Sequence, residues 1–357
     1  MKSPDVLTID EALTRLACFG DILDARTPAE YALDHIPGAI SSPVLSNDER
    51  VLIGTMYRQQ SGFEAKRAGA AIVARNIADL LDTQFQDRPR DWAPLVYCWR
   101  GGNRSGALAT VLARIGWRVS LLEGGYKAFR QRVMNDLEQF PAGLRFTVIA
   151  GRTGCGKSLL LQALDQLGAQ VLDLEAIARH RGSVLGRVPG EPQPAQRHFE
   201  TLLWQRLSRF DPSRPVFVES ESRRIGVCHL PESLTVAIRG GDCVVVEASR
   251  SARANFLLGQ YPHFLARPDE LDAQLLRLTE LHGREVVQSW RALVSAGQWA
   301  ELVDNLLGRH YDPAYDRSMT KNFRRLGEAR IHALDPNQPQ QLDDLARSLL
   351  SGRTESR

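Results

Sequence analysis

The sequence lacks the cysteine pattern of a disulfide-stabilised or zinc-binding protein. Its 357 residues contain only five cysteines, scattered along the chain at positions 18, 98, 155, 228 and 243. No two of them form a C-x-x-C pair, and none lies near a histidine at the spacing of a zinc site. We therefore expect no disulfide framework and no structural metal.

Long apolar runs and a strong charge of one sign are also absent. No apolar stretch approaches the roughly 18 residues that a membrane-spanning helix needs. The first residues, MKSPDVLTID, lack the basic start and apolar stretch of a signal peptide. The net charge is only +3, so charge alone does not indicate nucleic acid. These absences predict a cytoplasmic protein with no membrane contact.

Short apolar runs alternate with helical patterns along the chain, which is typical of α/β proteins with parallel sheets. At about 150 residues per domain, the length predicts two domains. We expect the first over 1–138, a Pro- and Gly-containing linker over 139–144, and the second over 145–357, with helical additions after about residue 251. The expected strands are 21–25, 94–98, 118–123, 145–150, 169–174, 215–220 and 243–249. The expected helices include 64–85, 104–116, 271–283 and 300–311.

The stretch CWRGGNRS begins at Cys98, directly after the apolar run LVY and before a helical pattern. In a strand–loop–helix arrangement the loop amides and the helix N-terminus stabilise an anion, which favours a thiolate. Arg100 and Arg104 add positive charge that could hold an oxyanion. We expect Cys98 to be a nucleophile in an anion-binding loop formed by Arg100, Gly101, Gly102, Arg104 and Ser105. The alternative is a small buried side chain at the end of a strand.

Residues 10–135 resemble the rhodanese family, which carries sulfur or a related atom on such a cysteine. The resemblance rests on DARTPAEYALDHIPGAISSP (24–43) and LLEGGYKAFR (121–130). The positions that match the family are Asp24, Arg26, His35, Gly38, Gly124, Gly125 and Tyr126. The loop spacing is C-x5-R, whereas single-domain rhodaneses more often have C-x4-R. The longer loop is similar to that of rhodanese-like phosphatases, although no general acid for a leaving group can be named.

The stretch GRTGCGKS (151–158) fits the phosphate-loop pattern G-x-x-x-x-G-K-[ST] and lies between a predicted strand and a predicted helix. Gly151, Gly154 and Gly156 would let backbone amides surround a diphosphate. Lys157 would supply charge, and the Ser158 hydroxyl could take a magnesium ion. The pattern indicates affinity for phosphates without specifying ATP or GTP.

Acidic partners for a magnesium ion should follow neighbouring strands. Asp173 and Glu175 lie at the end of one predicted strand, and Glu219 lies near the end of another. Most such loops pair with Asp, so an ordinary solvated carboxylate is an equal alternative for Glu219. Cys155, inside the loop, is interpreted as a small filler side chain.

Over nearly its whole length the chain resembles the tRNA 2-selenouridine synthase family. Besides the two loops, the supporting stretches are EGGYKAFR (123–130), GTMYRQ (54–59), VLDLEAIARHRGSVLG (171–186), QPAQRHFE (193–200) and VESESRRIG (218–226). The family often has Lys at the position of Arg58, and it varies at Arg152 and Cys155. Neither departure affects the chemistry described next.

The resemblance implies a two-step exchange at C2 of the wobble uridine, U34, of tRNA. A 2-thiouridine is first S-alkylated from geranyl diphosphate, and selenium from selenophosphate then replaces the geranylthio group. Cys98 would carry the selenium as an S-selanyl group, and the 151–158 loop would bind the departing diphosphate. The expected substrates are thiolated tRNAs such as those for Lys, Glu and Gln. We expect no tightly bound cofactor, a role for Mg²⁺ at most, and a monomer.

Contacts to RNA are predicted at basic clusters, because neutralised backbone phosphates supply most non-specific affinity. The family resemblance favours His180, Arg181, Arg223 and Arg224; the other candidates are Arg179, Arg250, Arg253 and the segment 317–325. For each cluster an ordinary solvated face is an equal alternative. Trp99 either packs beside its loop or stacks on an extruded base. An apolar pocket for the prenyl chain is expected in the second half, at residues that the sequence does not identify.

Two other functions fit parts of the pattern. A rhodanese-like phosphatase under nucleotide control would hydrolyse p-nitrophenyl phosphate. A nucleotide-switched RNA-binding module would bind tRNA without altering a base.

Overall fold

The structure, a computed structural model, describes residues 3–59, 61–183 and 185–351. The chain forms two compact units. The N-terminal unit comprises Met1–Asp136 and Arg197–Gln205, and the C-terminal unit comprises Leu137–Gln196 and Arg206–Arg357. The short segment from 197 to 205 thus returns to the N-terminal unit from within the second half of the chain.

The N-terminal unit is built on a five-stranded parallel sheet with strand order β1-β5-β4-β2-β3. Its strands are β1 (Asp5–Leu7), β2 (Ile22–Asp24), β3 (Ala39–Ser41), β4 (Leu95–Tyr97) and β5 (Ser120–Leu122). The central strands β2 and β4 are buried throughout, as expected where helices cover both faces of a parallel sheet.

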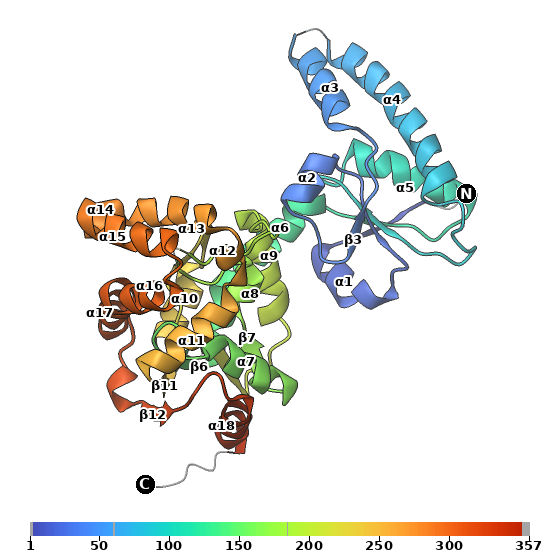
Figure 1. Cartoon of the computed structure of the whole chain (residues 1–357). Helices are drawn as coiled ribbons and strands as arrows, with labels where there is room; N and C mark the ends of the chain where they lie inside the picture. The colour runs from blue at the N-terminus through green and yellow to red at the C-terminus, as the bar shows by residue number, and fades with distance from the viewer. Residues whose placement is uncertain (1–2, 60, 184, 352–357) are drawn as a thin grey trace. The chain divides into compact units, whose positions relative to one another are not determined.

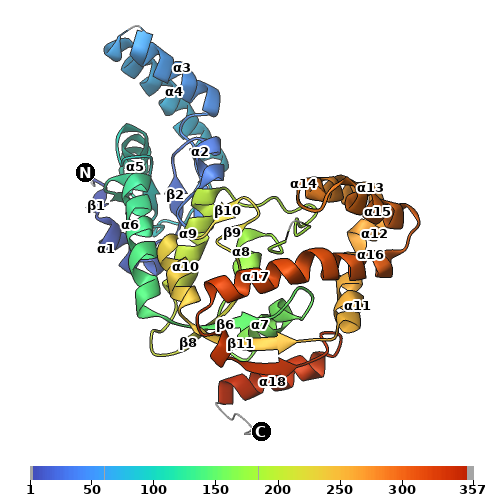
Figure 2. The same ribbon diagram turned by 90° about the vertical axis from the view of Figure 1, so that its left-hand side faces the viewer.

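The helices of this unit are α1 (Ile9–Thr14), α2 (Pro28–Leu33), α3 (Asn47–Gln59), α4 (Gly62–Thr83), α5 (Asn103–Ile115) and α6 (Gly125–Gln139), with a short 3₁₀ turn at Leu16–Cys18. Thr27 and Glu30 form a capping box that begins α2. Gly116, with φ +123°, ends α5. Figures 1 and 2 show α3 and α4 as a helical hairpin that projects away from the sheet.

The C-terminal unit contains a second five-stranded parallel sheet, with strand order β12-β11-β6-β8-β7. The strands are β6 (Arg145–Ala150), β7 (Gln170–Leu172), β8 (Pro215–Glu219), β11 (Asp242–Glu247) and β12 (Arg330–Ala333). A small antiparallel pair, β9 (Arg224–Ile225) and β10 (Cys228–His229), lies apart from it. Because β6 is central, the loop after it lies beside the carboxyl ends of β8 and β11, where parallel sheets bind ligands.

A 3₁₀ turn at Phe140–Gly143 precedes β6. The helices around this sheet are α7 (Lys157–Gln166), α8 (Leu174–Ala178), α10 (Glu232–Arg239) and α18 (Pro339–Ser351). Helix α9 (Gln196–Leu207) crosses the division between the units. A helical region with its own apolar core follows β11. It consists of α11 (Arg250–Gln260), α12 (Pro262–Ala266), α13 (Pro268–Leu275), α14 (Thr279–His282), α15 (Arg284–Ser295), α16 (Trp299–Leu306) and α17 (Asp312–Asn322), with 3₁₀ turns at Leu276–Leu278 and Leu326–Glu328 and a π-helical turn at Leu307–Tyr311.

All seven expected strands are present, and the α/β class is confirmed. The expected helix over 271–283 is wrong as a single element, because a 3₁₀ turn separates α13 from α14, and Gly283 ends the latter with φ +82°. The expected linker over 139–144 contains the end of α6 and the 3₁₀ turn Phe140–Gly143. Among the described residues, no helix has the length and apolarity needed to cross a membrane.

Candidate functional site

The loop that follows β4 is held against the turn that begins α6. The backbone N–H of Tyr126 donates to the carbonyl of Cys98 at 2.8 Å. Gly125 has φ +56°, and a Cβ there would lie 2.3 Å from the Cys98 carbonyl oxygen. Gly101 has φ +64°, and its Cβ would lie 2.6 Å from the Leu122 carbonyl oxygen. The close approach of loop and turn therefore requires glycine at both positions.

The Cys98 thiol is buried, with 3% of the residue exposed, in surroundings that stabilise its thiolate. The Ser105 hydroxyl donates to Sγ at 3.1 Å. Burial by itself raises the pKa of Cys98. Hydrogen bonds from the Ser105 hydroxyl and from the backbone N–H groups of Ser105, Arg100 and Gly102 outweigh it, so that the pKa lies below its ordinary value. Burial raises the pKa of the three other buried cysteines, Cys155, Cys228 and Cys243.

The two arginines of the loop differ in their partners. Arg104 forms an ion pair with Glu30 at 2.7 Å, and only 14% of its side chain is exposed. Arg100 is exposed and has no ion-pair partner in the described part of the chain. Both line a groove of about 940 Å³, together with Cys98 and Trp99. An incoming anion would therefore meet two guanidinium groups, that of Arg104, which Glu30 already neutralises, and that of Arg100, which has no carboxylate partner within the described ranges.

The other positions that match rhodaneses support the ends of the strands. Asp24 forms an ion pair with Arg26 at 2.6 Å, and both side chains are almost fully buried. The Arg26 guanidinium lies 3.9 Å from the ring centroid of Tyr126, whose hydroxyl donates to Asp34 at 2.7 Å. His35 stacks on a neighbouring tyrosine, and Gly38 adopts φ +81°. Gly124 also has positive φ, +67°. These residues hold the site in place and do not line the groove at Cys98.

Asp34 also connects the returning segment to this unit. Besides the bond from Tyr126, it accepts a hydrogen bond from Thr201 of α9 at 3.0 Å, and the His198 ring lies 3.3 Å from its other oxygen. Trp204 Nε1 donates to Asp136 at 2.8 Å. Polar contacts to two buried carboxylates thus fix the segment 197–205 on the N-terminal unit.

The loop after β6 has the geometry of a phosphate-binding loop. Gly154 and Gly156 adopt φ of +86° and +81°. A Cβ at Gly151 would lie 2.6 Å from the Val246 carbonyl oxygen, so only glycine lets the loop pass β11. Lys157, the first residue of α7, folds back on the loop and donates to the Gly151 carbonyl at 2.7 Å. It lies where it could turn toward a bound phosphate.

Acidic side chains near the ends of β7 and β8 lie in sequence from Ser158 inward. Its hydroxyl donates to Glu175 at 3.1 Å, and the backbone N–H of Glu175 donates to Glu219 at 2.8 Å. Asp173 instead caps α8, accepting from the Ala176 N–H at 2.8 Å. Burial raises the pKa of Glu219 well above its ordinary value, and the nearby carboxylates raise it further. Burial beside Glu175 likewise raises the pKa of Glu221 to about 8.

This acidic group fits a magnesium ion that also binds phosphate. Glu219 Oε2 is buried with no hydrogen-bond partner among the described residues. The described part of the chain contains no set of three His, Cys, Asp or Glu side chains arranged to hold a metal ion by themselves. Magnesium commonly takes one or two carboxylates and completes its shell with phosphate oxygens and water. Ser158 and Glu175 are placed for that role, with Glu219 directly behind them.

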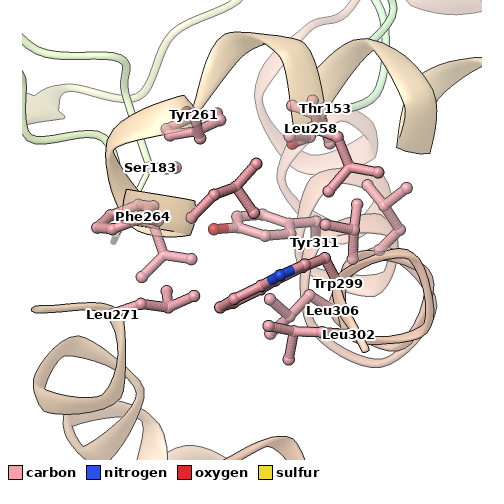
Figure 3. Close-up of a pocket in the computed structure, with 15 residues that line it drawn as sticks. Thr153, Ser183, Leu258, Tyr261, Phe264, Leu271, Trp299, Leu302, Leu306 and Tyr311 are labelled. Atoms are coloured by element: carbon pink, nitrogen blue, oxygen red, sulfur yellow. The ribbon is translucent and has the colours of Figure 1, made fainter. Parts of the chain in front are cut away.

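A groove of about 780 Å³, here called the phosphate groove, runs along the phosphate-binding loop and continues into an apolar pocket. Both are lined by Thr153, Ser183, Leu257, Tyr261 and Tyr311. The remaining walls of the pocket are apolar, formed by Leu185, Leu258, Phe264, Leu265, Leu271, Trp299, Leu302, Val303, Leu306 and Leu307. Figure 3 shows Thr153 and Leu258 on the side of the pocket opposite Leu271 and Leu302. The pocket is narrow, about 70 Å³. It offers an apolar environment directly beside the 151–158 loop.

The structure places the predicted RNA contacts in different surroundings. His180 is buried and lines the phosphate groove together with Arg181, which stacks on the Tyr261 ring at 4.7 Å. Arg223 is exposed but pairs with Glu232 at 2.6 Å, and Arg224 is exposed, with its Nε bonded to the Gly226 carbonyl.

One of the other candidates is wrong as a surface contact. Arg253 is 3% exposed, pairs with Asp312 at 2.8 Å and donates to the Thr153 carbonyl at 3.1 Å. It supports the phosphate-binding loop from within. Arg179 lines the phosphate groove, while Arg250 pairs with Asp304 and Arg325 with Asp242.

Sequence reasoning missed several residues of both sites. Glu30, which neutralises Arg104, gave no signal beyond its place in a capping box. Glu221 lies only two residues after Glu219 and could have been found from the alternating acids of VESES. The apolar pocket draws its walls from seven separate elements and loops, so no local pattern reveals it.

Comparisons with known proteins match these two units. The family model described as tRNA 2-selenouridine synthase AAA domain matches residues 144–274, and that of the rhodanese-like domain matches residues 8–132. The chain is 34% identical over 268 residues to a tRNA 2-selenouridine synthase of Nitrosomonas europaea, covering 73% of this chain and 68% of the relative. It is 31% identical over 332 residues to one of Alcanivorax borkumensis, covering 84% and 90%. A solved rhodanese-related protein of Thermoplasma volcanium shares 18% identity and a TM-score of 0.24, covering 36% of this chain and 92% of that one.

Proposed function

The chain belongs to the tRNA 2-selenouridine synthase family, and we propose that it converts 2-thiouridine at the wobble position of tRNA into 2-selenouridine. The reaction has two steps, S-geranylation from geranyl diphosphate and exchange of the geranylthio group for selenium from selenophosphate. Its substrates are the thiolated tRNAs for Lys, Glu and Gln, and its place is the cytoplasm.

The observation that carries this proposal is the apolar pocket that opens beside the phosphate-binding loop. A prenyl diphosphate needs a site for a multiply charged anionic head next to a site for a hydrocarbon chain. The loop amides and Lys157 are suited to the diphosphate, and the walls that begin at Tyr261 and Tyr311 are suited to the chain. A nucleotide would instead place a polar base and ribose against these apolar walls.

In the first step a bond forms between C1 of the geranyl group and the sulfur on C2 of the uridine. The bond from C1 to the diphosphate oxygen breaks, the diphosphate keeps the electron pair, and the proton on N3 is lost. Lys157 and the amides of the loop stabilise the charge that develops on the departing diphosphate. Magnesium, held by Ser158 and Glu175, would neutralise that charge further.

In the second step selenium bonds to C2 and the geranylthio group leaves as a thiol. Alkylation prepares this displacement, because a sulfur that carries an alkyl group leaves more readily than an anionic sulfur. Cys98 carries the selenium as an S-selanyl group, for which its stabilised thiolate is suited. Loading breaks the P–Se bond of selenophosphate and releases phosphate, which takes an oxygen from water, while a disulfide accepts the two electrons that are removed as the S–Se bond forms. After selenium has bonded to C2, a thiol attacks Sγ and the S–Se bond breaks with its electron pair on selenium. Cys98 is left as a mixed disulfide, which a second thiol reduces.

Mass spectrometry of nucleosides from thiolated tRNA tests the proposal. The protein with geranyl diphosphate alone should yield S-geranyl-2-thiouridine, and adding selenophosphate should yield 2-selenouridine. With both substrates, the Cys98→Ser protein should yield only the geranylated nucleoside. The Lys157→Ala protein should already fail at the first step, geranylation. Normal selenation by Cys98→Ser would remove Cys98 as the carrier. Unchanged geranylation by Lys157→Ala would remove the phosphate-binding loop from the first step.

A further inference from the structure

The groove at Cys98 carries more positive charge than the two-step chemistry uses. Five basic side chains line it, and no carboxylate does: Arg50, Arg58, Lys66, Arg100 and Arg104. Only Arg104 is neutralised, by Glu30. The other four have no ion-pair partner within residues 3–59, 61–183 and 185–351, and all four are exposed. The phosphate groove of the other unit differs, because acids such as Glu175 and Glu191 line it beside its cations.

The groove is too large for a small oxyanion alone. Its volume of about 940 Å³ lies at the upper end of the roughly 300–1,000 Å³ range of pockets that enclose ligands of drug size or larger. Three of its four free cations, Arg50, Arg58 and Lys66, come from the α3–α4 hairpin and not from the catalytic loop. Selenophosphate at the Cys98 loop would leave these three hairpin cations without a partner. The size and the spread of charge fit an extended polyanion.

Aromatic side chains accompany these cations. Tyr57 lines the groove with 55% of its surface exposed, and Trp99 lines it half-buried. Phe63, at the start of α4, is 71% exposed. Exposed aromatic rings among basic side chains stack on unpaired bases, whereas duplex RNA has no free base faces to offer them.

We propose that the groove between the α3–α4 hairpin and the Cys98 loop binds a single-stranded segment of RNA. Arg50, Arg58, Lys66 and Arg100 contact its phosphates, and Tyr57 stacks on one of its bases. This inference rests on the proposed function, since it gives the tRNA substrate a place at the selenium-carrying cysteine. An unpaired anticodon loop has the required chemistry, because its bases can turn out toward Sγ while its backbone follows the hairpin.

The salt dependence of binding gives the expected magnitude. For single strands the affinity falls with a log–log slope of about 0.7 per phosphate contact, so four contacts give a slope of about 2.8. Raising the salt concentration from 50 to 200 mM would then weaken binding about 50-fold. Removing two of the cations should lower the slope by about 1.4. Loss of the stacking ring should weaken binding about tenfold at any salt concentration.

Fluorescence anisotropy with a labelled anticodon stem-loop, titrated with full-length protein at several salt concentrations, measures these quantities. The test variants are Arg58→Ala/Lys66→Ala and Tyr57→Ala, with Tyr57→Phe expected to restore binding. The matched controls on the same hairpin are Arg67→Ala, which loses a cation paired with Glu64 outside the groove, and Leu52→Ala, which loses an exposed apolar side chain. A blunt duplex of the same length should bind more weakly than the stem-loop.

Protection of Cys98 provides a second measurement that needs no variant. Saturating stem-loop should slow alkylation of Cys98 by iodoacetamide, while the exposed Cys18 should react at an unchanged rate. Wild-type affinity and slope in Arg58→Ala/Lys66→Ala, together with no protection of Cys98, would overturn the inference even if the protein modifies tRNA normally. Protection by the duplex but not by the stem-loop would overturn it in favour of double-stranded RNA. Failure to alter any base while the stem-loop still binds and protects would instead refute the proposed function.

Discussion

Replacing Ser105 by Ala should make Cys98 a much weaker nucleophile at neutral pH. The Ser105 hydroxyl donates to Sγ at 3.1 Å inside a site where both residues are almost fully buried, so no water can readily replace it. A hydrogen bond to a charged group contributes about 1.5–3 kcal/mol. Because one pKa unit corresponds to about 1.4 kcal/mol, its loss should lower the thiolate fraction roughly 10- to 150-fold below the pKa.

The assay is the rate of Cys98 alkylation by iodoacetamide as a function of pH, followed by mass spectrometry. Thiolate forms as the pH rises through the pKa, so the profile of the wild-type protein should rise at a lower pH than that of an ordinary thiol. The Ser105→Ala profile should move to higher pH. Ser42→Ala is the matched control, since that buried serine of the same unit donates to Gln84 and not to sulfur. Coincident profiles for Ser105→Ala and wild type would refute the electrostatic account of Cys98.

Three further predictions concern the loops and the pocket. Val303→Phe should narrow the apolar pocket and raise the KM for geranyl diphosphate about 15-fold in steady-state kinetics, since excluding two methylene groups costs about 1.6 kcal/mol. Inhibition by inorganic diphosphate, which has no hydrocarbon chain, should not change. If inhibition by diphosphate weakened to the same extent as binding of geranyl diphosphate, the geranyl chain would bind outside this pocket. Burial raises the pKa of Glu221 in the folded protein to about 8. Between about pH 4.5 and 8 the folded state therefore holds a proton that the unfolded chain has released, so thermal stability without ligand should fall as the pH rises through this range. Glu221→Gln should flatten that dependence. A slope identical in both proteins would contradict the buried acidic group. Gly125→Ala should lower the free energy of unfolding by about 2 kcal/mol or more in urea titrations, because its Cβ would clash with the Cys98 carbonyl; Gly143→Ala, in open space, should cost much less.

Much of the fold could be predicted because its signals are local. Strand, glycine-rich loop and helix follow one another directly at both Cys98 and Gly151, and Gly101, Gly154 and Gly156 adopt the positive φ that favours glycine. The short edge strands β1 and β12 were missed, because three or four residues carry too little periodicity.

The remainder of the sites depends on contacts between distant segments. Glu30 reaches Arg104 across 74 residues, and Asp34 meets Thr201 across 167. In the sequence, the basic residues of the α3–α4 hairpin have the pattern of an ordinary solvated helix. Their place beside Cys98 is visible only in the folded structure. Conversely, Arg253 reads as a surface cation although it is buried under the phosphate-binding loop. Proximity of this kind follows from tertiary packing and leaves no pattern in a single sequence.

The central claim is that the Cys98 sulfur takes up selenium. Intact-protein mass spectrometry after incubation with selenophosphate and a thiol–disulfide couple tests it most directly, with tryptic mapping to locate the adduct. One selenium atom, recognised by its isotope pattern, should appear on the Cys98 peptide, disappear on adding excess thiol, and be absent from Cys98→Ser. Selenium that appears on another cysteine, or on the Cys98→Ser protein to the same extent, would contradict the account.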